Sequence, residues 1–236
     1  MVVAPSRWRR VLAPVLAALP VFAVLCALGT WQVKRLAWKN DLLARIEASE
    51  RAPPVPLGAA AQPFAKVVAT GRFDHAHEAL LGLEVRGVAL GAHLLTPLLR
   101  AGLPPLLVDR GWVPLERDRP IDRPDGEVAV TGFVREADHR TWLSPADDAP
   151  QRRFYLFDPE AIGAALNLPA APAPFGLVAL APPAAGARPP LPEAARSLPR
   201  PDNRHLGYVI TWYGLAVSLV AVVAAFTRQR IKDSSA

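Results

Sequence analysis

The chain has 236 residues, with 27 Lys and Arg against 21 Asp and Glu, which gives a formal net charge of +6. The excess lies towards the two ends: residues 1–30 carry three Arg and no acid, residues 206–236 carry three bases and one acid, and the middle of the chain is nearly neutral. Because a nucleic-acid-binding protein concentrates positive charge on its folded domain, this distribution argues against nucleic acid as a partner and favours the lipid bilayer.

The first apolar run spans residues 11–30 and contains no charged residue. At about 1.5 Å per residue it can cross a hydrocarbon layer of roughly 30 Å, which predicts a transmembrane helix after a basic cytoplasmic segment, residues 1–10. A cleaved signal peptide is the alternative, because Ala27-Leu-Gly29 resembles a cleavage site. A signal core has only about 7–15 apolar residues, so an uncleaved anchor is favoured. The chain's one cysteine, Cys26, lies in this run, which excludes internal disulfides and paired-thiol metal or redox sites.

Residues 31–50 continue the helical pattern beyond this run. Trp31, Trp38, Leu42 and Ile46 recur at helical spacing, which predicts a helical extension with one face on the soluble domain. Trp31 is expected at the level of the lipid headgroups, where tryptophan is enriched. A Pro-Pro pair follows and is expected to end the helix.

The middle of the chain, residues 31–204, predicts one α+β domain on the outer side of the membrane. Short apolar runs separated by Gly, Pro and Asp are typical of a mainly antiparallel or mixed sheet. A short helix is expected over 158–166, with Asp158 as its N-cap and a proline first. Residues 169–201 hold ten prolines and predict an extended connector back to the membrane. The expected strands are 64–73, 79–85, 94–99, 106–113, 127–134, 154–157 and 175–180.

The second apolar run spans residues 205–226 and predicts a second transmembrane helix. A basic tail, residues 227–236, follows it, so by the positive-inside tendency both termini are expected in the cytoplasm. No long amphipathic leader precedes the first run, which favours a bacterial inner membrane over an imported organelle protein. The expected domain therefore lies in the periplasm.

The second run has two unlike faces when it is wound as a helix. His205, Tyr208 and Trp212 share one face and are candidates for holding a ligand at the membrane edge. Small residues allow close helix approach, so the opposite face is expected to pack on the first span and to leave His205 facing away from it. The same residue types also fit a plain helix contact with interfacial aromatics and a capping or solvated histidine. The small-residue face consists of Gly207, Thr211, Gly214 and Ser218.

Signatures of catalysis are absent from the sequence, so an enzyme is not expected. There is no Gly-x-Ser-x-Gly elbow, phosphate-binding loop or dinucleotide fingerprint. Asp74-His-Ala-His-Glu78 could place two imidazoles on one side of a strand as metal ligands, or it could be a polar strand end. His93 and His139 have no companion ligand nearby and are interpreted as hydrogen-bonded polar residues.

The segment Asp109-Arg-Gly-Trp-Val-Pro114 ends an expected strand, and its glycine indicates a tight backbone position. Arg110 and Trp112 either pack within the domain or, with Trp31, contribute to a partner surface. Residue types alone do not separate these two interpretations.

Several short motifs occur in order along the chain, together with the two apolar runs. They are Gly29-Thr-Trp-Gln-Val-Lys-Arg-Leu36, Trp38-Lys39, Gly71-x-Phe73, Leu95-Thr-Pro97, Val108-Asp-Arg-Gly-Trp-Val-Pro114, Val130-Thr-Gly132, His205-Leu-x-Tyr208 and Thr211-Trp-Tyr213. Each motif is weak alone, but the ordered set is highly specific. It resembles the surfeit-locus protein one family of cytochrome c oxidase assembly factors over nearly the whole chain.

The resemblance implies a two-span inner-membrane protein that helps to mature the oxidase. It implies that haem a is bound transiently and placed in the oxidase catalytic subunit, with the haem a synthesis enzyme as a further partner. His205 matches the haem ligand proposed for the family, and Tyr208 and Trp212 are expected to shelter the macrocycle. The alternative is a cofactor-free membrane scaffold that stabilises the catalytic subunit during assembly.

Overall fold

A computed structural model describes residues 7–58, 62–116, 119–181 and 190–233 of the chain. It divides into two compact units, Ile46–Pro199 and the combination of Met1–Arg45 with Arg200–Ala236. The expected domain, 31–204, is longer than the first unit because most of its helical extension belongs with the terminal helices. Three parts of the expected N-terminal segment, connector and tail lie outside the described residues: 1–6, 182–189 and 234–236.

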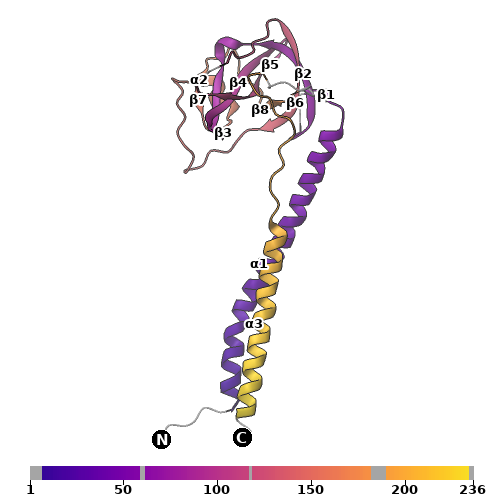
Figure 1. The fold of residues 1–236 in the computed structure, drawn as a ribbon, viewed down its shortest axis with the longest axis vertical. Helices are drawn as coiled ribbons and strands as arrows, with labels where there is room; N and C mark the ends of the chain where they lie inside the picture. The colour runs from indigo at the N-terminus through magenta and orange to yellow at the C-terminus, as the bar shows by residue number, and fades with distance from the viewer. Residues whose placement is uncertain (1–6, 59–61, 117–118, 182–189, 234–236) are drawn as a thin grey trace. The chain divides into compact units, whose positions relative to one another are not determined.

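The Ile46–Pro199 unit is built around a five-stranded barrel (Figure 1). Hydrogen-bonded neighbours follow the order β2, β6, β8, β5 and β4, and β4 also pairs with β2 to close the ring. β3 and β7 extend the sheet beyond β4, and β1 extends it beyond β2. The strands are β1 (Val55–Pro56), β2 (Lys66–Phe73), β3 (Ala79–Arg86), β4 (Ala89–Arg100), β5 (Leu103–Pro114), β6 (Glu127–Glu136), β7 (Arg153–Phe154) and β8 (Phe175–Ala179).

The strand pairing confirms the expected mixed, mainly antiparallel sheet. Parallel pairs join β1 to β2, β3 to β7 and β5 to β8, and the remaining pairs are antiparallel. Closure into a barrel is a feature that the sequence pattern does not reveal. It depends on a close approach at the end of β2, where a Cβ atom added at Gly71 would lie 2.5 Å from the backbone oxygen of Leu99. Any side chain there would hold β2 and β4 apart.

β5 shows how the barrel shares its core with helix α2 (Pro159–Ala165). Leu106 and Val108 belong to the apolar cluster formed by the barrel strands, whereas Leu107 belongs to the cluster that contains Ile162 of α2. Alternate residues of a strand face opposite sides. A strand covered on both faces is therefore a continuous buried run, as observed over the last ten residues of β5.

Helix α2 confirms the short helix expected over 158–166. The side chain of Asp158 accepts a hydrogen bond from the backbone N–H of Ala161 at 3.1 Å, and Pro159 is the first helical residue. This N-cap satisfies a donor that has no partner within the helix. Local sequence signals therefore specify where this helix begins.

The strand expected over 154–157 is wrong. Only its first residue belongs to the short strand β7, and the backbone N–H of Phe157 donates instead to the carboxylate of Asp138 at 2.8 Å. Phe157 is buried in the cluster under α2. Its apolar character reflects that packing and does not indicate a place in the sheet. The other six expected strands overlap β2, β3, β4, β5, β6 and β8.

Part of the expected connector, 169–201, belongs to the barrel unit. β8 lies within it, and Glu193 exchanges backbone hydrogen bonds with Trp112 at 2.8 and 3.1 Å. Leu191 and Leu198 are buried. Residues 190–199 therefore pack on the barrel over much of their length.

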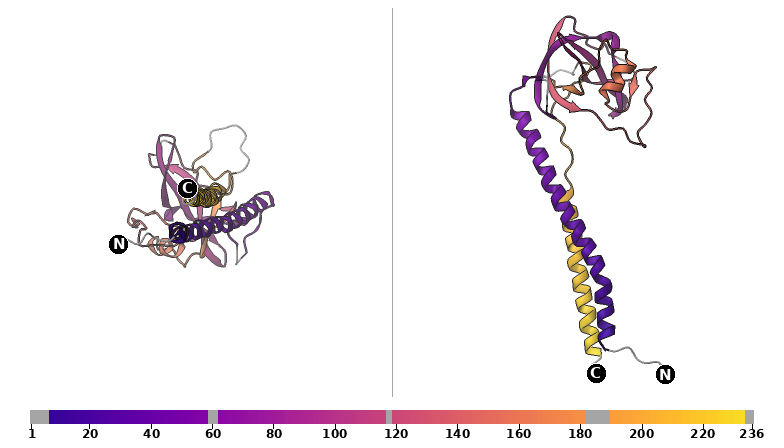
Figure 2. Two further views of the ribbon diagram at one scale, coloured as in Figure 1. Left: turned by 90° about the horizontal axis from the view of Figure 1, so that it is seen from below. Right: turned by 180° about the vertical axis from the view of Figure 1, so that it is seen from behind.

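Helices α1 (Arg7–Arg51) and α3 (His205–Asp233) are both long and apolar enough to cross a bilayer, by length and composition. They lie side by side (Figure 1 and Figure 2) and their side chains meet in antiparallel order. α1 contains the first apolar run and the extension 31–50 as one continuous helix, which confirms the expected extension.

The expected face of this extension is wrong. Ile46 is buried and Leu42 is half-buried, but Trp31 and Trp38 are exposed. Trp38 instead stacks under the guanidinium of Arg35, which lies 4.0 Å from its ring centroid. Helical spacing identified the helix, but the tryptophans do not belong to its buried face.

Candidate functional site

The paired helices place His205 against Gln32. His205 is the first residue of α3, and its Nδ1 lies 2.8 Å from Oε1 of Gln32 on α1. Gln32 is 7% exposed, so its amide lies within the contact between the two helices, which we call the helix seam. This overturns the expected orientation, in which His205 faces away from the first span.

The helix seam also contains Tyr213. Its hydroxyl lies 3.0 Å from Oγ1 of Thr30, and a Cβ atom added at Gly29 would lie 2.9–3.1 Å from three atoms of its ring. Gly29 therefore lets the tyrosine ring contact the backbone of α1. A third polar contact joins Nδ2 of Asn203 to Oδ1 of Asn40 at 2.8 Å. Together these contacts set the spacing and the register of the two helices.

The small-residue face of α3 does not make this contact, contrary to expectation. A Cβ atom added at Gly207 or Gly214 would meet no atom within 4 Å. The hydroxyls of Thr211 and Ser218 donate to backbone carbonyls of their own helix. In the helix seam, α1 supplies the small residue, Gly29, and α3 supplies the large one, Tyr213. The close approach of the helices therefore does not need glycines on α3.

The two aromatic residues expected beside His205 differ in their surroundings. Tyr208 is 54% exposed. Trp212 is half-buried, and among the described residues its Nε1 has no hydrogen-bond acceptor. Tyr208 follows His205 by three residues and is its neighbour on the helix surface. The structure therefore leaves an exposed aromatic flank next to the imidazole.

The contact with Gln32 determines which nitrogen of His205 is free. An amide oxygen only accepts hydrogen bonds, so Nδ1 carries the proton and donates it. No described residue bonds Nε2, which in the neutral ring keeps its lone pair. Histidines that bind metals generally donate their other ring N–H to an oxygen in this way. The arrangement is therefore suited to coordination through Nε2.

Arg110 and Trp112 are buried, at 7% and 4% exposure, so they are not the partner surface that was one of the two interpretations. The indole Nε1 of Trp112 donates to the backbone oxygen of Glu84 at 3.2 Å. The packing interpretation is confirmed for both residues. Trp31, the third member of that predicted surface, is exposed and stays a candidate for partner contact.

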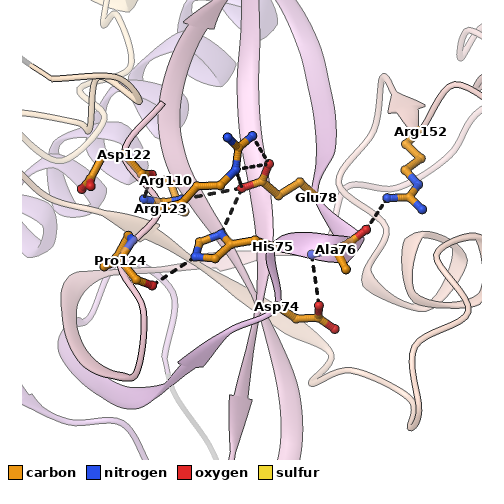
Figure 3. A network of polar contacts seen from close by, with 9 residues as sticks. All are labelled: Asp74, His75, Ala76, Glu78, Arg110, Asp122, Arg123, Pro124 and Arg152. Atoms are coloured by element: carbon orange, nitrogen blue, oxygen red, sulfur yellow. Dashed lines mark hydrogen bonds and ion pairs between the residues drawn. The ribbon is translucent and has the colours of Figure 1, made fainter. Parts of the chain in front are cut away.

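Arg110 joins the Asp74–Glu78 segment in a polar cluster (Figure 3). Its guanidinium lies 4.7 Å from the ring centroid of Phe73, and its Nη2 donates to the backbone oxygen of Asp122 at 2.7 Å. Burial lowers the pKa of Arg110, and the carboxylate of Glu78, 3.8 Å from Nη1, offsets part of that effect. Two motifs far apart in the sequence thus form one structural cluster.

His75 and His77 lie in a 3-10 turn, η1 (His75–His77), and each has its own partners. The ring of His75 contacts Oε1 of Glu78 and the backbone oxygen of Pro124, both at 3.1 Å, while Nδ1 of His77 lies 2.6 Å from Asp74. The polar interpretation of this segment is confirmed. Within the described ranges, no group of three or more His, Cys, Asp or Glu side chains is placed to hold a metal ion.

His93 lies between two carboxylates, which confirms its interpretation as a hydrogen-bonded residue. Its Nδ1 is 2.9 Å from Asp109 and its Nε2 is 3.0 Å from Glu84. Burial lowers the pKa of His93, but the hydrogen bonds and charges of Asp109 and Glu84 outweigh burial and raise the pKa above 6.5. Because both neighbours accept, the folded state favours the imidazolium.

We expect this arrangement to make the barrel less stable as pH rises. A group whose pKa is raised on folding contributes all of its stabilisation below its unfolded pKa, about 6.5, and loses it as pH passes the folded value. His93→Gln should remove this dependence, measured as the change in free energy of unfolding by urea between pH 6 and pH 9. His139→Gln, at an exposed position, should keep it. Equal pH dependence in the parent and His93→Gln would contradict the assignment.

Residues 19–217, from α1 through the barrel to α3, match the SURF1 family model. The chain is 30% identical to Surfeit locus protein 1 of Homo sapiens over 229 residues, covering 86% of this chain and 73% of the human protein. The chain belongs to the SURF1 family. This confirms the resemblance found in the motifs.

Two further relatives are a mouse protein and a yeast protein named for cytochrome oxidase assembly. The mouse Surfeit locus protein 1 is 30% identical over 220 residues, covering 83% of this chain and 70% of the mouse protein. The cytochrome oxidase assembly protein SHY1 of Saccharomyces cerevisiae is 32% identical over 154 residues, covering 58% of this chain and 39% of the yeast protein. The residues matched by the SURF1 family model, 19–217, include the parts of both helices that form the helix seam and the whole barrel.

Sequence reasoning assigned no role to Gln32, although it lies in one of the motifs that carry the SURF1 resemblance. A signal was present, because Gln32 follows Gly29 by three residues and so shares its helix face. An uncharged polar side chain at the end of an apolar run needs a polar partner. The partner of His93 was also missed, since Asp109 reaches it only through the register of β4 against β5.

Proposed function

We propose that this SURF1 chain assists cytochrome c oxidase assembly by binding haem a at His205 and helping to insert it into the catalytic subunit. The contact between His205 and Gln32 carries the proposal, because it leaves Nε2 with a lone pair at the first residue of an apolar helix. The name of the yeast relative, cytochrome oxidase assembly protein SHY1, supports the assembly role. The haem a synthesis enzyme is the proposed donor.

The side chains around His205 suit a lipophilic iron porphyrin. His205 would hold haem through Nε2, which would bind the iron ion that the cofactor supplies. Leu206, Tyr208 and Ile210 are exposed along the same end of α3 and offer apolar surface for a macrocycle. The indole Nε1 of Trp212 is buried and has no acceptor within the described part of the chain. The donor set therefore fits the group.

The proposed setting is the bacterial inner membrane, with α1 and α3 as its two spans and both termini in the cytoplasm. His205 then lies at the outer edge of the bilayer, because the uncharged run of α3 begins immediately after it. A ligand at this edge stays in contact with lipid and remains accessible to another membrane protein. An accessible site suits a protein that must release its cargo.

The deciding experiment is a comparison of haem content after co-expression with the haem a synthesis enzymes. His205→Ala should lower the Soret absorbance and the extractable haem a at least about tenfold, since loss of the nitrogen ligand removes the iron–protein bond. His139→Ala, which changes an exposed histidine of the barrel unit, should carry as much haem as the parent. Both quantities are measured on purified full-length protein in detergent.

Two outcomes would count against the proposal. Haem retained in full by His205→Ala would exclude this residue as the ligand. A His205→Ala strain that assembles oxidase with normal haem a content would favour the cofactor-free scaffold, which holds the catalytic subunit during assembly.

A further inference from the structure

We infer that Gln32 is a positioning residue for His205, which fixes the imidazole as its Nδ1–H tautomer before any ligand arrives. The role of this tautomer in haem binding rests on the proposed function, whereas the tautomer itself is a property of the haem-free chain. Gln32 on α1 thus belongs to the same site as His205 on α3.

The geometry of the contact shows that the ring of His205 is hydrogen-bonded to Gln32. Nδ1 and Oε1 are 2.8 Å apart, a normal distance for a hydrogen bond between a ring N–H and a carbonyl oxygen. Which ring nitrogen of a neutral histidine carries the proton is set by the hydrogen bond that its ring makes. A free histidine side chain prefers the proton on Nε2, the opposite tautomer, which would block coordination through that atom. Gln32 reverses this preference.

The burial of Gln32 strengthens this hydrogen bond. Gln32 is 7% exposed, so water competes poorly for its amide oxygen. A buried acceptor without a donor is destabilising, so while Oε1 of Gln32 faces the ring, a state of His205 without a proton on Nδ1 is disfavoured. The hydrogen bond therefore fixes both the tautomer and the direction of the ring.

The amide of Gln32 is uncharged, which favours the neutral form of the imidazole. A carboxylate at this position would attract a second proton to the ring and favour the imidazolium, which has no lone pair to offer a metal. Glutamine accepts the Nδ1 proton without adding charge. It therefore prepares a neutral ligand, which is the form that coordinates iron.

The helix seam holds α1 and α3 close enough for the side chain of Gln32 to reach His205. Gly29 lies one turn before it on α1 and contacts the ring of Tyr213, whose hydroxyl meets Thr30. These contacts fix how far α3 stands from α1. Gln32 can then span the remaining gap to His205 without an intervening water. The positioning of His205 is thus a property of both helices.

The test is the ¹⁵N NMR spectrum of ring-labelled histidine in the haem-free, full-length protein in detergent. The chain has five histidines, so the difference from the spectrum of His205→Ala identifies the His205 signals. We expect Nδ1 to appear as the protonated nitrogen and Nε2 as the unprotonated one at a pH where the ring is neutral. In Gln32→Leu the Nε2–H form should gain population, and haem affinity should fall about 10- to 100-fold, as for other residues that orient metal ligands.

A matched control separates positioning from helix pairing. Thr30→Val removes the hydroxyl contact with Tyr213. It keeps the packing of the Tyr213 ring on Gly29 and leaves Gln32 and His205 in place, so it should keep the parent tautomer. A tautomer change of the same size in Thr30→Val would show that helix pairing alone is responsible and would overturn the inference.

The NMR spectrum tests the role of Gln32, and the haem measurement tests the proposed function, so either one can be contradicted without the other. A parent spectrum with the proton of His205 on Nε2 overturns the role of Gln32, whatever the haem content. An Nδ1–H spectrum combined with normal haem binding in His205→Ala would leave the tautomer assignment standing and reject the proposed function.

Discussion

Gly111→Ala should destabilise the barrel by about 2–6 kcal/mol. Gly111 has φ of 123°, in a region that side chains rarely adopt, and an added Cβ atom would overlap the backbone carbonyl of Glu193. That carbonyl accepts the backbone N–H of Trp112 at 3.1 Å, so the substitution both strains β5 and pushes away the segment packed on it. Urea unfolding of the full-length protein in detergent, followed by near-ultraviolet circular dichroism, measures the loss.

Gly102→Ala is the matched control for this prediction. Gly102 has φ of 68°, but a Cβ atom there would meet nothing within 4 Å. Only the backbone strain applies, so the expected cost is about 1–2 kcal/mol. Equal losses for the two variants would mean that the contact between Gly111 and Glu193 is not as close as described.

Gly29→Val should separate α1 from α3. A Cβ atom at Gly29 would lie 2.9–3.1 Å from the ring of Tyr213, closer than side chains normally pack, and valine adds two further methyl groups. Overpacking costs about 1–3 kcal/mol, so the population of paired helices should fall about tenfold, because 1.4 kcal/mol is a factor of ten. The measurement is crosslinking by a short bifunctional thiol reagent between cysteines placed at Asn40 and Asn203, in a Cys26→Ser background.

Gly214→Val tests whether the loss is specific to the helix seam. Gly214 lies beside Tyr213 on α3, yet a Cβ atom there would meet nothing within 4 Å. Crosslinking should therefore match that of the parent. If Gly214→Val reduces the yield and Gly29→Val does not, the originally expected small-residue face is the true contact.

The candidate site could be found only in part from the sequence. His205 stands out because it begins an uncharged run, and the motif around it carries the family resemblance. Its hydrogen bond to Gln32 joins residues 173 positions apart and depends on how two helices rotate against each other. Both faces of α3 satisfy a pattern for helix packing, so composition could not decide between them. Gly29 on α1 determines which face of α3 packs there, because it makes room for the ring of Tyr213.

Arg110 and Trp112 illustrate the same limit in the barrel. Arginine and tryptophan are common in both interfaces and packed clusters, so their residue types do not reveal burial. Closure of the barrel and the return of the chain at Glu193 enclose them. Their acceptors are backbone oxygens of Asp122 and Glu84, which only the fold brings within reach.

The sequence by itself determined the elements whose signals are local. Uncharged runs define the apolar helices, alternating short runs define most strands, and Asp158 with Pro159 defines the start of α2, because each signal acts within a few residues. The tertiary structure decided barrel closure, the burial of Arg110 and the orientation of His205. Each of these depends on distances between segments far apart in the chain, and those distances are set by packing, where the absence of one Cβ atom at Gly29, Gly71 or Gly111 changes which surfaces can meet.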